Sequence, residues 1–293
     1  MQIHRLSAAL AAVALVSTPA ALAQSGDFAV FAEANGQGST SVDYGPYREF
    51  FSALSVQERG RTLVAYDAVR ESAGSFLAAY ANGLSRVDVT ALKRDDQLAF
   101  WLNARNMLVV KALSEERSLR GFDNKRGTPM APGPLWTEPR ITINGVDLSI
   151  QDIETEIILA GWDSPYVLYG LYQGLEGGPP LRAEPFLGET VHATLTGIAQ
   201  DYTDDRDIVR VRRNTVRLGE FYEWYAPVAF DGDSSALLAH VSEASGKSDV
   251  ATPGLELDFK SMSTSVEQFR VRQRSSGGFG SGSSSGGGFG RGS

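Results

Sequence analysis

The chain has 293 residues, a formal net charge of −8 and no cysteine. The absence of cysteine excludes a thiol nucleophile, disulfide bonds, thiolate zinc sites and thiolate-held iron–sulfur clusters. With 42% hydrophobic and 21% charged residues, the composition is that of a globular protein, long enough for one large domain or two small ones. The acidic balance argues against nucleic acid or an anionic membrane surface as the main partner.

The first 23 residues have the pattern of a secretory signal peptide. Arg5 lies in a short polar segment, an apolar stretch runs from Leu6 to Val16, and Ala21-Leu22-Ala23 supplies the small residues that a signal peptidase reads. The apolar stretch is shorter than the roughly 20 residues that span a bilayer. We therefore expect cleavage after Ala23 and a periplasmic or extracellular protein without a membrane span, with an uncleaved N-terminal anchor as the alternative.

Cleavage would leave His192 and His240 as the only histidines. A metal site with three histidines from one chain would then be impossible, although two histidines and a carboxylate could still bind a metal in principle. Each histidine falls in a predicted amphipathic helix, where a single histidine is usually a surface or packing residue. We expect no metal and no cofactor.

Residues 42–246 have the pattern of a single α+β domain. We expect a helix-rich N-terminal part, two β-hairpins, and helices packed on a mostly antiparallel sheet. The spacing of apolar residues predicts one or two helices over residues 63–80 and a long helix over residues 94–116. A loop rich in proline and glycine follows at residues 129–134.

Two hairpins are predicted further along the chain. Residues 140–148 alternate around Asn144-Gly145, a pair typical of the type I′ turn, and residues 208–218 have a second hairpin pattern. Ser149 is predicted to begin a helix, because Asp152 follows it at the spacing of a capping box. The remaining predicted helices cover residues 189–202, 219–225 and 235–244.

Composition divides the rest of the chain. Residues 24–41 form an N-terminal extension, residues 247–274 have the mixed composition of a linker, and residues 275–293 are rich in glycine and serine. The last segment has too little apolar surface to offset its ordering entropy, so we expect a disordered tail.

Five short segments between residues 42 and 245 resemble motifs of the domain-of-unknown-function 547 (DUF547) family. They are similar to an opening motif, an aromatic-Trp-(Ile/Leu)-Asn-x-Tyr-Asn helix, a Leu-Ser-Leu-x-x-Ile-Glu segment, the end of a Cys-Pro-x-Leu loop and a closing Phe-x-Trp-Tyr segment. In chain order the segments are Val42-Asp43-Tyr44, Ala99-Phe100-Trp101-Leu102-Asn103-Ala104-Arg105-Asn106, Leu148-Ser149-Ile150-Gln151-Asp152-Ile153-Glu154, Pro179-Pro180-Leu181-Arg182 and Phe221-Tyr222-Glu223-Trp224-Tyr225.

The chain departs from this family at the positions that look reactive. Family members commonly have histidine where Thr155 stands and cysteine where Gly178 stands. They often have another cysteine at Gln173 and a histidine near Leu168, and their asparagine helix ends in Tyr-Asn where this chain has Arg105-Asn106. The family is linked by distant fold resemblance to papain-like or transglutaminase-like hydrolases, so the resemblance implies a thiol and an imidazole that are both absent here.

The candidate ligand-binding residues are Asn103, Asn106, Glu154, Gly178 and Arg182. The two asparagines are three residues apart and share a helix face, where they could orient a ligand carbonyl or tie the helix to neighbouring backbone. The glycine-rich loop at residues 173–181, which contains Gly178, could approach a ligand closely, or it could be the remnant of the family's cysteine loop.

Two acidic residues are the candidates for catalysis. Glu154 and Asp152 could form a carboxylate pair for acid–base chemistry, but acidic residues are also common in a first helical turn for capping and dipole reasons. A third interpretation is an ion pair between Glu154 and Arg182. It would fix the helix that begins at Ser149 to the glycine-rich loop, which contains Gly178-Pro179-Pro180.

Our leading hypothesis is a secreted, non-catalytic binding or interaction domain, because the motifs of the scaffold persist while the expected cysteine and histidine do not. Its partner would be an unknown small molecule, a peptide or an envelope protein. The alternative is a hydrolase or transferase that uses Glu154, Asp152 and the asparagine helix. A weaker third interpretation is an assembly protein that works through its tail.

Overall fold

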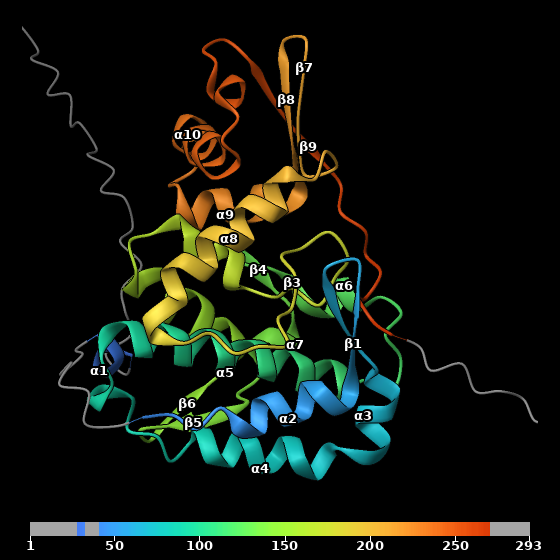
Figure 1. The fold of residues 1–293 in the computed structure, drawn as a ribbon, viewed down its shortest axis with the longest axis vertical. Coiled ribbons are helices and arrows are strands. Elements are labelled where there is room, and N and C mark those ends of the chain that lie inside the picture. The colour runs from blue at the N-terminus through green and yellow to red at the C-terminus, as the bar shows by residue number, and fades with distance from the viewer. Residues whose placement is uncertain (1–27, 33–40, 270–293) are drawn as a thin grey trace, which may run out of the picture.

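The computed structural model describes residues 28–32 and 41–269 (Figure 1). The expected signal peptide (residues 1–23) and the glycine/serine-rich tail (275–293) lie outside the described residues, as does most of the 24–41 extension.

The described chain has the predicted α+β class and is dominated by helices. The α-helices are α1 (Ala29–Ala32), α2 (Gly45–Leu54), α3 (Tyr66–Ser72), α4 (Gly74–Leu84), α5 (Arg94–Glu115), α6 (Phe122–Arg126), α7 (Pro134–Thr137), α8 (Val191–Asp204), α9 (Glu220–Ala229) and α10 (Ser234–Ser245). Short 3₁₀ turns occur at η1 (Val89–Ala91), η3 (Pro165–Gly170), η4 (Gly188–Thr190) and η5 (Ser248–Ala251), and η2 (Asp152–Leu159) is a π-helical stretch.

The strands form four small sheets among the described residues, and most of their pairs are antiparallel. Three sheets are single hairpins, and in the fourth β9 runs parallel to β8. The strands are β1 (Ser55–Glu58), β2 (Arg61–Val64), β3 (Gly127–Thr128), β4 (Ala131–Pro132), β5 (Ile141–Ile143), β6 (Val146–Leu148), β7 (Val209–Arg212), β8 (Thr215–Gly219) and β9 (Glu256–Lys260). Strands of two to five residues bury little surface, so within residues 28–32 and 41–269 no single continuous sheet organises the core.

The core is built around α5, which crosses the middle of the molecule (Figure 1). The N-terminal helices α2 and α4 lie below it in that view, and α8, α9, α10 and the three-stranded sheet lie above it. Leu98, Trp101, Leu108 and Leu113 are buried on several sides of α5. A helix that is apolar all round belongs in the interior, which explains this central position.

Local sequence signals account for the segment that leads to the candidate site. Asn144 and Gly145 have φ angles of 49° and 79°, as the predicted type I′ turn between β5 and β6 requires. The backbone N–H of Ser149 donates to Asp152 Oδ2 (2.8 Å), and the N–H of Asp152 donates to Ser149 Oγ (3.0 Å). This reciprocal pair is the predicted capping box, and the helix that it starts widens into η2.

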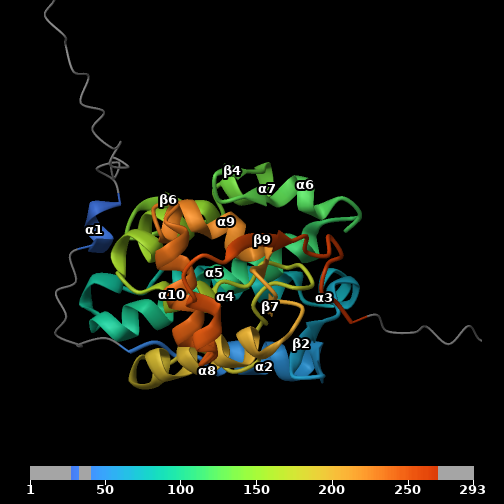
Figure 2. The same ribbon diagram turned by 90° about the horizontal axis from the view of Figure 1, so that it is seen from above.

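The segment expected to be a linker takes part in the fold. Residues 247–269 contain η5 and β9, and the chain after β9 returns along the molecule to the hairpin of β1 and β2 (Figure 2). The reason is non-local, because β9 pairs with β8 and the returning segment pairs with Val64 in β2.

Candidate functional site

The two asparagines of α5 hold neighbouring backbone. Asn103 Nδ2 donates to the Phe186 carbonyl (2.9 Å), and the Phe186 N–H donates back to Asn103 Oδ1 (2.8 Å). Asn106 Nδ2 donates to the Gly170 carbonyl (2.8 Å), and the Tyr172 N–H donates to Asn106 Oδ1 (3.1 Å). Both side chains are buried. Each amide therefore clamps one loop segment onto α5 through a donor and an acceptor.

Glu154 pairs with Arg105, so the predicted ion pair between Glu154 and Arg182 is wrong. Arg105 Nε donates to Glu154 Oε2 (3.1 Å), Nη2 donates to the same oxygen, and both side chains are 0% exposed. The hydroxyl of Tyr225 donates to the other oxygen of Glu154. Arg105 reaches Glu154 because α5 packs against η2, whereas the guanidinium of Arg182 lies 5.6 Å from the ring of Phe186.

Gln173 and Arg126 extend this arrangement, and the sequence motifs did not indicate the role of either. Gln173 Nε2 donates to the Tyr225 hydroxyl (2.8 Å), and Arg126 Nη2 donates to Gln173 Oε1. The guanidinium of Arg126 lies 5.1 Å and 4.6 Å from the ring centroids of Trp136 and Trp224. Burial lowers the pKa of Arg126. We call Arg105, Asn106, Arg126, Glu154, Gln173 and Tyr225 the buried polar cluster.

One signal in the sequence could have identified the partner of Glu154. Arg105 stands where the family resemblance has tyrosine, and it lies in a helix whose positions from Leu98 to Leu113 are mostly apolar. A guanidinium placed in the interior requires a buried anion and further acceptors. Glu154 supplies the anion, and Asn106 Oδ1 (3.0 Å) and the Tyr172 carbonyl accept from Arg105 Nη1.

The loop that contains Gly178 packs against Gln173 on its inner side and accepts hydrogen bonds on its outer side. A Cβ atom added at Gly178 would lie 3.1 Å from Cβ and 3.2 Å from Cγ of Gln173, so a side chain at position 178 would crowd the Gln173 stem. On the outer side, Arg61 Nη2 donates to the Gly178 carbonyl (2.8 Å), and the Tyr202 hydroxyl donates to the Gly177 carbonyl (2.7 Å).

The other candidate residues lie apart from the buried polar cluster. The carboxylate of Asp152 accepts hydrogen bonds from Ser149 and so caps the helix. The carboxylate of Glu154 accepts from Arg105 instead. Thr155, at the position of the family's histidine, donates to the Gln151 carbonyl (3.0 Å). The structure therefore does not bring Asp152 and Glu154 together as a working pair.

The two histidines are held by different surroundings. His240 Nε2 lies 3.2 Å from the Tyr169 hydroxyl in a buried aromatic group, and burial lowers the pKa of His240 to about 4. His192 is exposed, with Nε2 3.0 Å from Asp95 Oδ1. Within residues 28–32 and 41–269, no three or more His, Asp or Glu side chains gather in a way that could hold a metal ion.

Residues 263–269, which we call the strap, run between β2 and the glycine-rich loop. Val266 faces Leu175 in antiparallel pairing, and Gln268 pairs with Val64 in parallel. Three backbone hydrogen bonds hold the strap: Glu176 N–H to Ser265 O (2.9 Å), Glu267 N–H to Gly174 O (3.0 Å) and Phe269 N–H to Val64 O (3.0 Å).

A second arginine–glutamate pair anchors the strap. Arg61 Nε donates to Glu267 Oε1, and the two side chains are 30% and 3% exposed. Glu267 Oε2 is buried without a hydrogen-bond partner among the described residues. Burial raises the pKa of Glu267, although the neighbouring Arg61 opposes this shift.

The central part of this chain matches a known protein family. Residues 89–203 match the family model described as "Protein of unknown function, DUF547". Over these residues the chain is similar to the DUF547 family, and we call residues 89–203 the DUF547 segment. No match was found among curated proteins or among solved structures. The DUF547 segment contributes α5, η2 and the glycine-rich loop, while Arg61, Tyr225 and the strap come from outside it.

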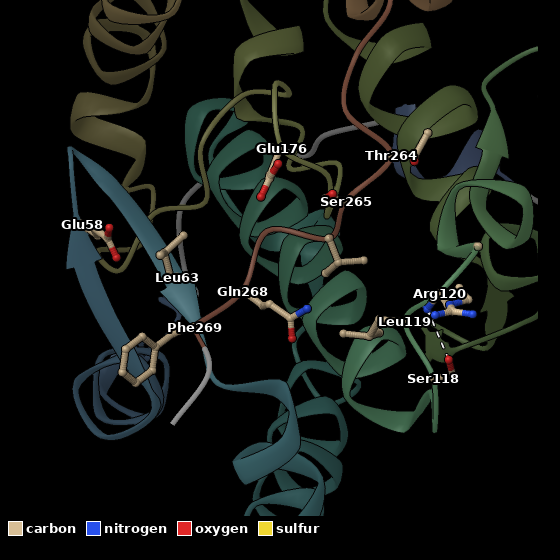
Figure 3. A pocket seen from close by; sticks show the side chains of 12 residues that line it. Glu58, Leu63, Ser118, Leu119, Arg120, Glu176, Thr264, Ser265, Gln268 and Phe269 are labelled. Carbon is tan, nitrogen blue, oxygen red and sulfur yellow. Dashed lines mark hydrogen bonds between the residues drawn. The ribbon is translucent and has the colours of Figure 1, made fainter. Parts of the chain in front are cut away.

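Two open clefts flank the strap where it meets the DUF547 segment. One, of about 760 Å³, includes Leu119, Arg120 and Ser265 in its lining; the other, of about 630 Å³, includes Arg61, Gly177, Tyr202 and Glu267. Figure 3 shows the strap passing between the β1–β2 hairpin and the segment of Leu119 and Arg120. Neither cleft is lined by Asn103, Asn106 or Glu154.

A membrane span is absent from the described part of the chain. None of the helices in residues 28–32 and 41–269 combines the length and the apolar character that crossing a bilayer requires.

Proposed function

We propose that this chain is a secreted, non-catalytic binding domain of the DUF547 type. The observation that carries the proposal is the packing at Gly178. The resemblance puts a cysteine at this position, but the Cβ of a side chain there would lie 3.1–3.2 Å from the stem of Gln173, which would have to shift by a few tenths of an ångström. Gln173 is itself held by Tyr225 and Arg126, so it is not free to move aside.

The buried polar cluster supports the same proposal. A catalytic group must reach the reacting atoms of a substrate, but Glu154 and Arg105 are 0% exposed and bonded to each other. Both carboxylate oxygens of Glu154 already accept hydrogen bonds. The cluster is therefore suited to fixing α5, η2 and the glycine-rich loop relative to one another.

The ligand of such a domain would bind in the clefts beside the strap. Their volumes, about 630 and 760 Å³, lie in the range of sites for small molecules or peptide side chains. Arg61 offers a partly exposed guanidinium in the smaller cleft, next to the carbonyl groups of Gly177 and Gly178. This surface can bind a polar ligand without any residue of the buried polar cluster.

A substrate panel tests the absence of catalysis. Wild-type protein and Tyr225→Phe would be assayed on peptide, ester, amide, glycoside and acyl-transfer substrates. We expect no turnover by either protein. Turnover by the wild type that is lost in Tyr225→Phe, at an unchanged circular dichroism spectrum, would establish the hydrolase or transferase alternative and overturn the proposal.

Binding is measured on the same protein preparation. Amide shifts would be recorded by NMR while a library of small polar molecules and short peptides is added. We expect saturable shifts that cluster at Arg61, Tyr202 and Glu176, and that are lost in Arg61→Ala. Shifts confined to other surfaces, or unchanged in Arg61→Ala, would contradict this placement of the ligand.

Secretion has a direct test. The full chain would be expressed in a bacterial host, and the mass of the protein would be measured in the periplasmic and cytoplasmic fractions. The signal-peptide pattern predicts a periplasmic product that begins at Gln24. A full-length product retained in the cytoplasm would contradict secretion and leave the binding proposal unaffected.

A further inference from the structure

We propose that the groove between Val64 in β2 and residues 174–176 is a site for an extended peptide, and that the strap occupies this site from within the same chain. The external partner would be a peptide with an apolar residue followed by a carboxylate residue, like Val266-Glu267. This inference rests on the proposed binding function and names the class of ligand.

The groove has the main-chain groups that strand addition requires. The carbonyl groups of Val64 and Gly174 accept from the strap, and the N–H of Glu176 donates to it. The strap therefore receives backbone hydrogen bonds from two segments that are far apart in sequence. Peptide recognition by strand addition takes its affinity from such main-chain bonds and its specificity from alternate side chains.

Two side chains of the strap supply the specificity. Val266 is buried opposite Leu175, and Glu267 is buried against Arg61. Arg61 also donates to the Gly178 carbonyl, so one guanidinium links the acidic residue of the strap to the glycine-rich loop. A peptide without the carboxylate would lose the charge-assisted hydrogen bond from Arg61 Nε.

The strap is held weakly enough to be exchanged. Open clefts of about 760 and 630 Å³ lie along it, and Val266 is its only buried apolar residue. Segments with few buried apolar contacts open locally at a free energy below that of global unfolding.

The carboxylate of Glu267 is only partly hydrogen-bonded in the groove, because its Oε2 atom lacks a partner among the described residues. Oε2 is buried, and Arg61 Nε serves the other oxygen while Arg61 Nη2 serves Gly178. The strap is tethered to β9 a few residues upstream, which limits how its carboxylate can turn. A free peptide lacks this tether and can approach the bidentate geometry that arginine and carboxylate prefer.

The test uses the full chain and a fluorescein-labelled peptide with the sequence of residues 262–269. The variant Val266→Ser/Glu267→Arg weakens the strap without altering the groove. Because a tethered strap competes at an effective concentration in the millimolar range, we expect the variant to bind the peptide at least about tenfold more tightly than the wild type does. Adding Arg61→Ala to the variant should abolish binding, and so should the same serine and arginine changes in the peptide.

An engineered disulfide that fixes the strap in the groove provides the matched control. Glu176 and Ser265 are exposed and lie opposite each other in the antiparallel pairing, and the chain has no cysteine of its own. Cα atoms in such a pair are about 5.5 Å apart, within the range of a disulfide. In Glu176→Cys/Ser265→Cys, the reduced protein should bind the peptide as the wild type does, and the oxidised protein at least about tenfold more weakly.

Hydrogen exchange on the wild type keeps the proposal testable if the strap variant does not fold. The amides of Glu176, Glu267 and Phe269 should exchange at least about 100-fold faster than the interior amides of α5, because local opening suffices to expose them. Equal protection in the two regions would overturn the proposal, as would a folded strap variant that does not bind the peptide.

The outcomes separate this inference from the proposed function. A strap variant that binds members of the small-molecule library but ignores the peptide overturns the peptide assignment alone. Turnover in the substrate panel overturns the non-catalytic function, while the peptide titration stands or falls by its own result.

Discussion

Two arginine–glutamate pairs in this molecule have the same chemistry and opposite surroundings. Arg105 and Glu154 join α5 to η2 within the DUF547 segment, and both side chains are 0% exposed. Arg61 and Glu267 join β2 to the strap outside that segment, with 30% and 3% exposure, and one oxygen of Glu267 is unpartnered among the described residues.

The difference separates polar groups that are enclosed in the interior from polar groups that border an open cleft. Every oxygen of Glu154 is hydrogen-bonded, so a ligand could gain nothing there without breaking the interior. The pair of Arg61 and Glu267 borders an open cleft and retains unused hydrogen-bonding capacity. Arg105 and Glu154, which lie in or beside the family motifs, thus hold the core, whereas Arg61 and Glu267, outside the motifs, line the wall of an open cleft.

Removal of the Glu154 charge should give the largest effect. Glu154→Gln leaves Arg105 buried without its anion, so we expect the free energy of unfolding to fall by about 3–5 kcal/mol. Urea denaturation followed by circular dichroism measures this loss. Glu156→Gln, a partly exposed position two residues further along η2, is the matched control and should change stability by less than about 0.5 kcal/mol. Equal effects at the two positions would show that Glu154 is not a scaffold charge.

The stability of the protein should depend on pH partly through His240, and this part has to be known before the two arginine–glutamate pairs are compared at low pH. Burial lowers the pKa of His240 from 6.5 to about 4, so below pH 6.5 the unfolded chain takes up a proton that the folded chain refuses. Stability should therefore fall as the pH drops from 6.5 to 4, by up to about 3 kcal/mol.

The measurement is urea denaturation at several pH values in this window. His240→Gln should flatten the decline, whereas the exposed His192→Gln should retain it. A decline of the same size in His240→Gln would assign it to carboxylates instead.

Removing one backbone clamp should have a smaller effect. Asn103→Ala leaves the carbonyl and the N–H of Phe186 buried without their partners, at a cost of about 1–3 kcal/mol. Thermal unfolding gives the value, and the exposed Asn124→Ala is the control, expected within about 0.5 kcal/mol of wild type. No loss in Asn103→Ala, with new ligand binding at this position, would return Asn103 to the candidate binding residues.

The parts of the fold that could be predicted are those fixed by local chemistry. The turn at Asn144-Gly145, the capping box of Ser149 and Asp152, and the long helix α5 depend on neighbours within a few residues, and all three are confirmed. The partner of Glu154 was predicted wrongly because ion pairing joins elements that are far apart in sequence. Arg105 lies 49 residues from Glu154, so their pairing depends on how α5 packs against η2 and not on neighbouring sequence.

The strap was missed for a different reason. Its sequence, Ser-Thr-Ser-Val-Glu-Gln-Phe, has one buried apolar residue and lies shortly before the glycine- and serine-rich stretch, so composition favoured a linker. Its extended conformation depends on carbonyl groups supplied by Val64 and Gly174. Short edge segments of this kind acquire their structure from the tertiary context and carry little propensity of their own.

The smallest expected effect is at Glu267. Glu267→Gln keeps an oxygen that can accept from Arg61 Nε, and Arg61 is partly hydrated, so we expect a loss of at most about 1 kcal/mol at pH 7. Because burial raises the pKa of Glu267, the folded protein holds this proton more tightly than the unfolded chain does. The wild type should therefore gain stability relative to Glu267→Gln as the pH falls through this raised pKa towards 4.5, the opposite direction to His240. Paired urea titrations of the two proteins at pH 7 and pH 5 measure this difference. A loss as large as that of Glu154→Gln at pH 7 would make the strap part of the scaffold and remove the contrast between the two pairs.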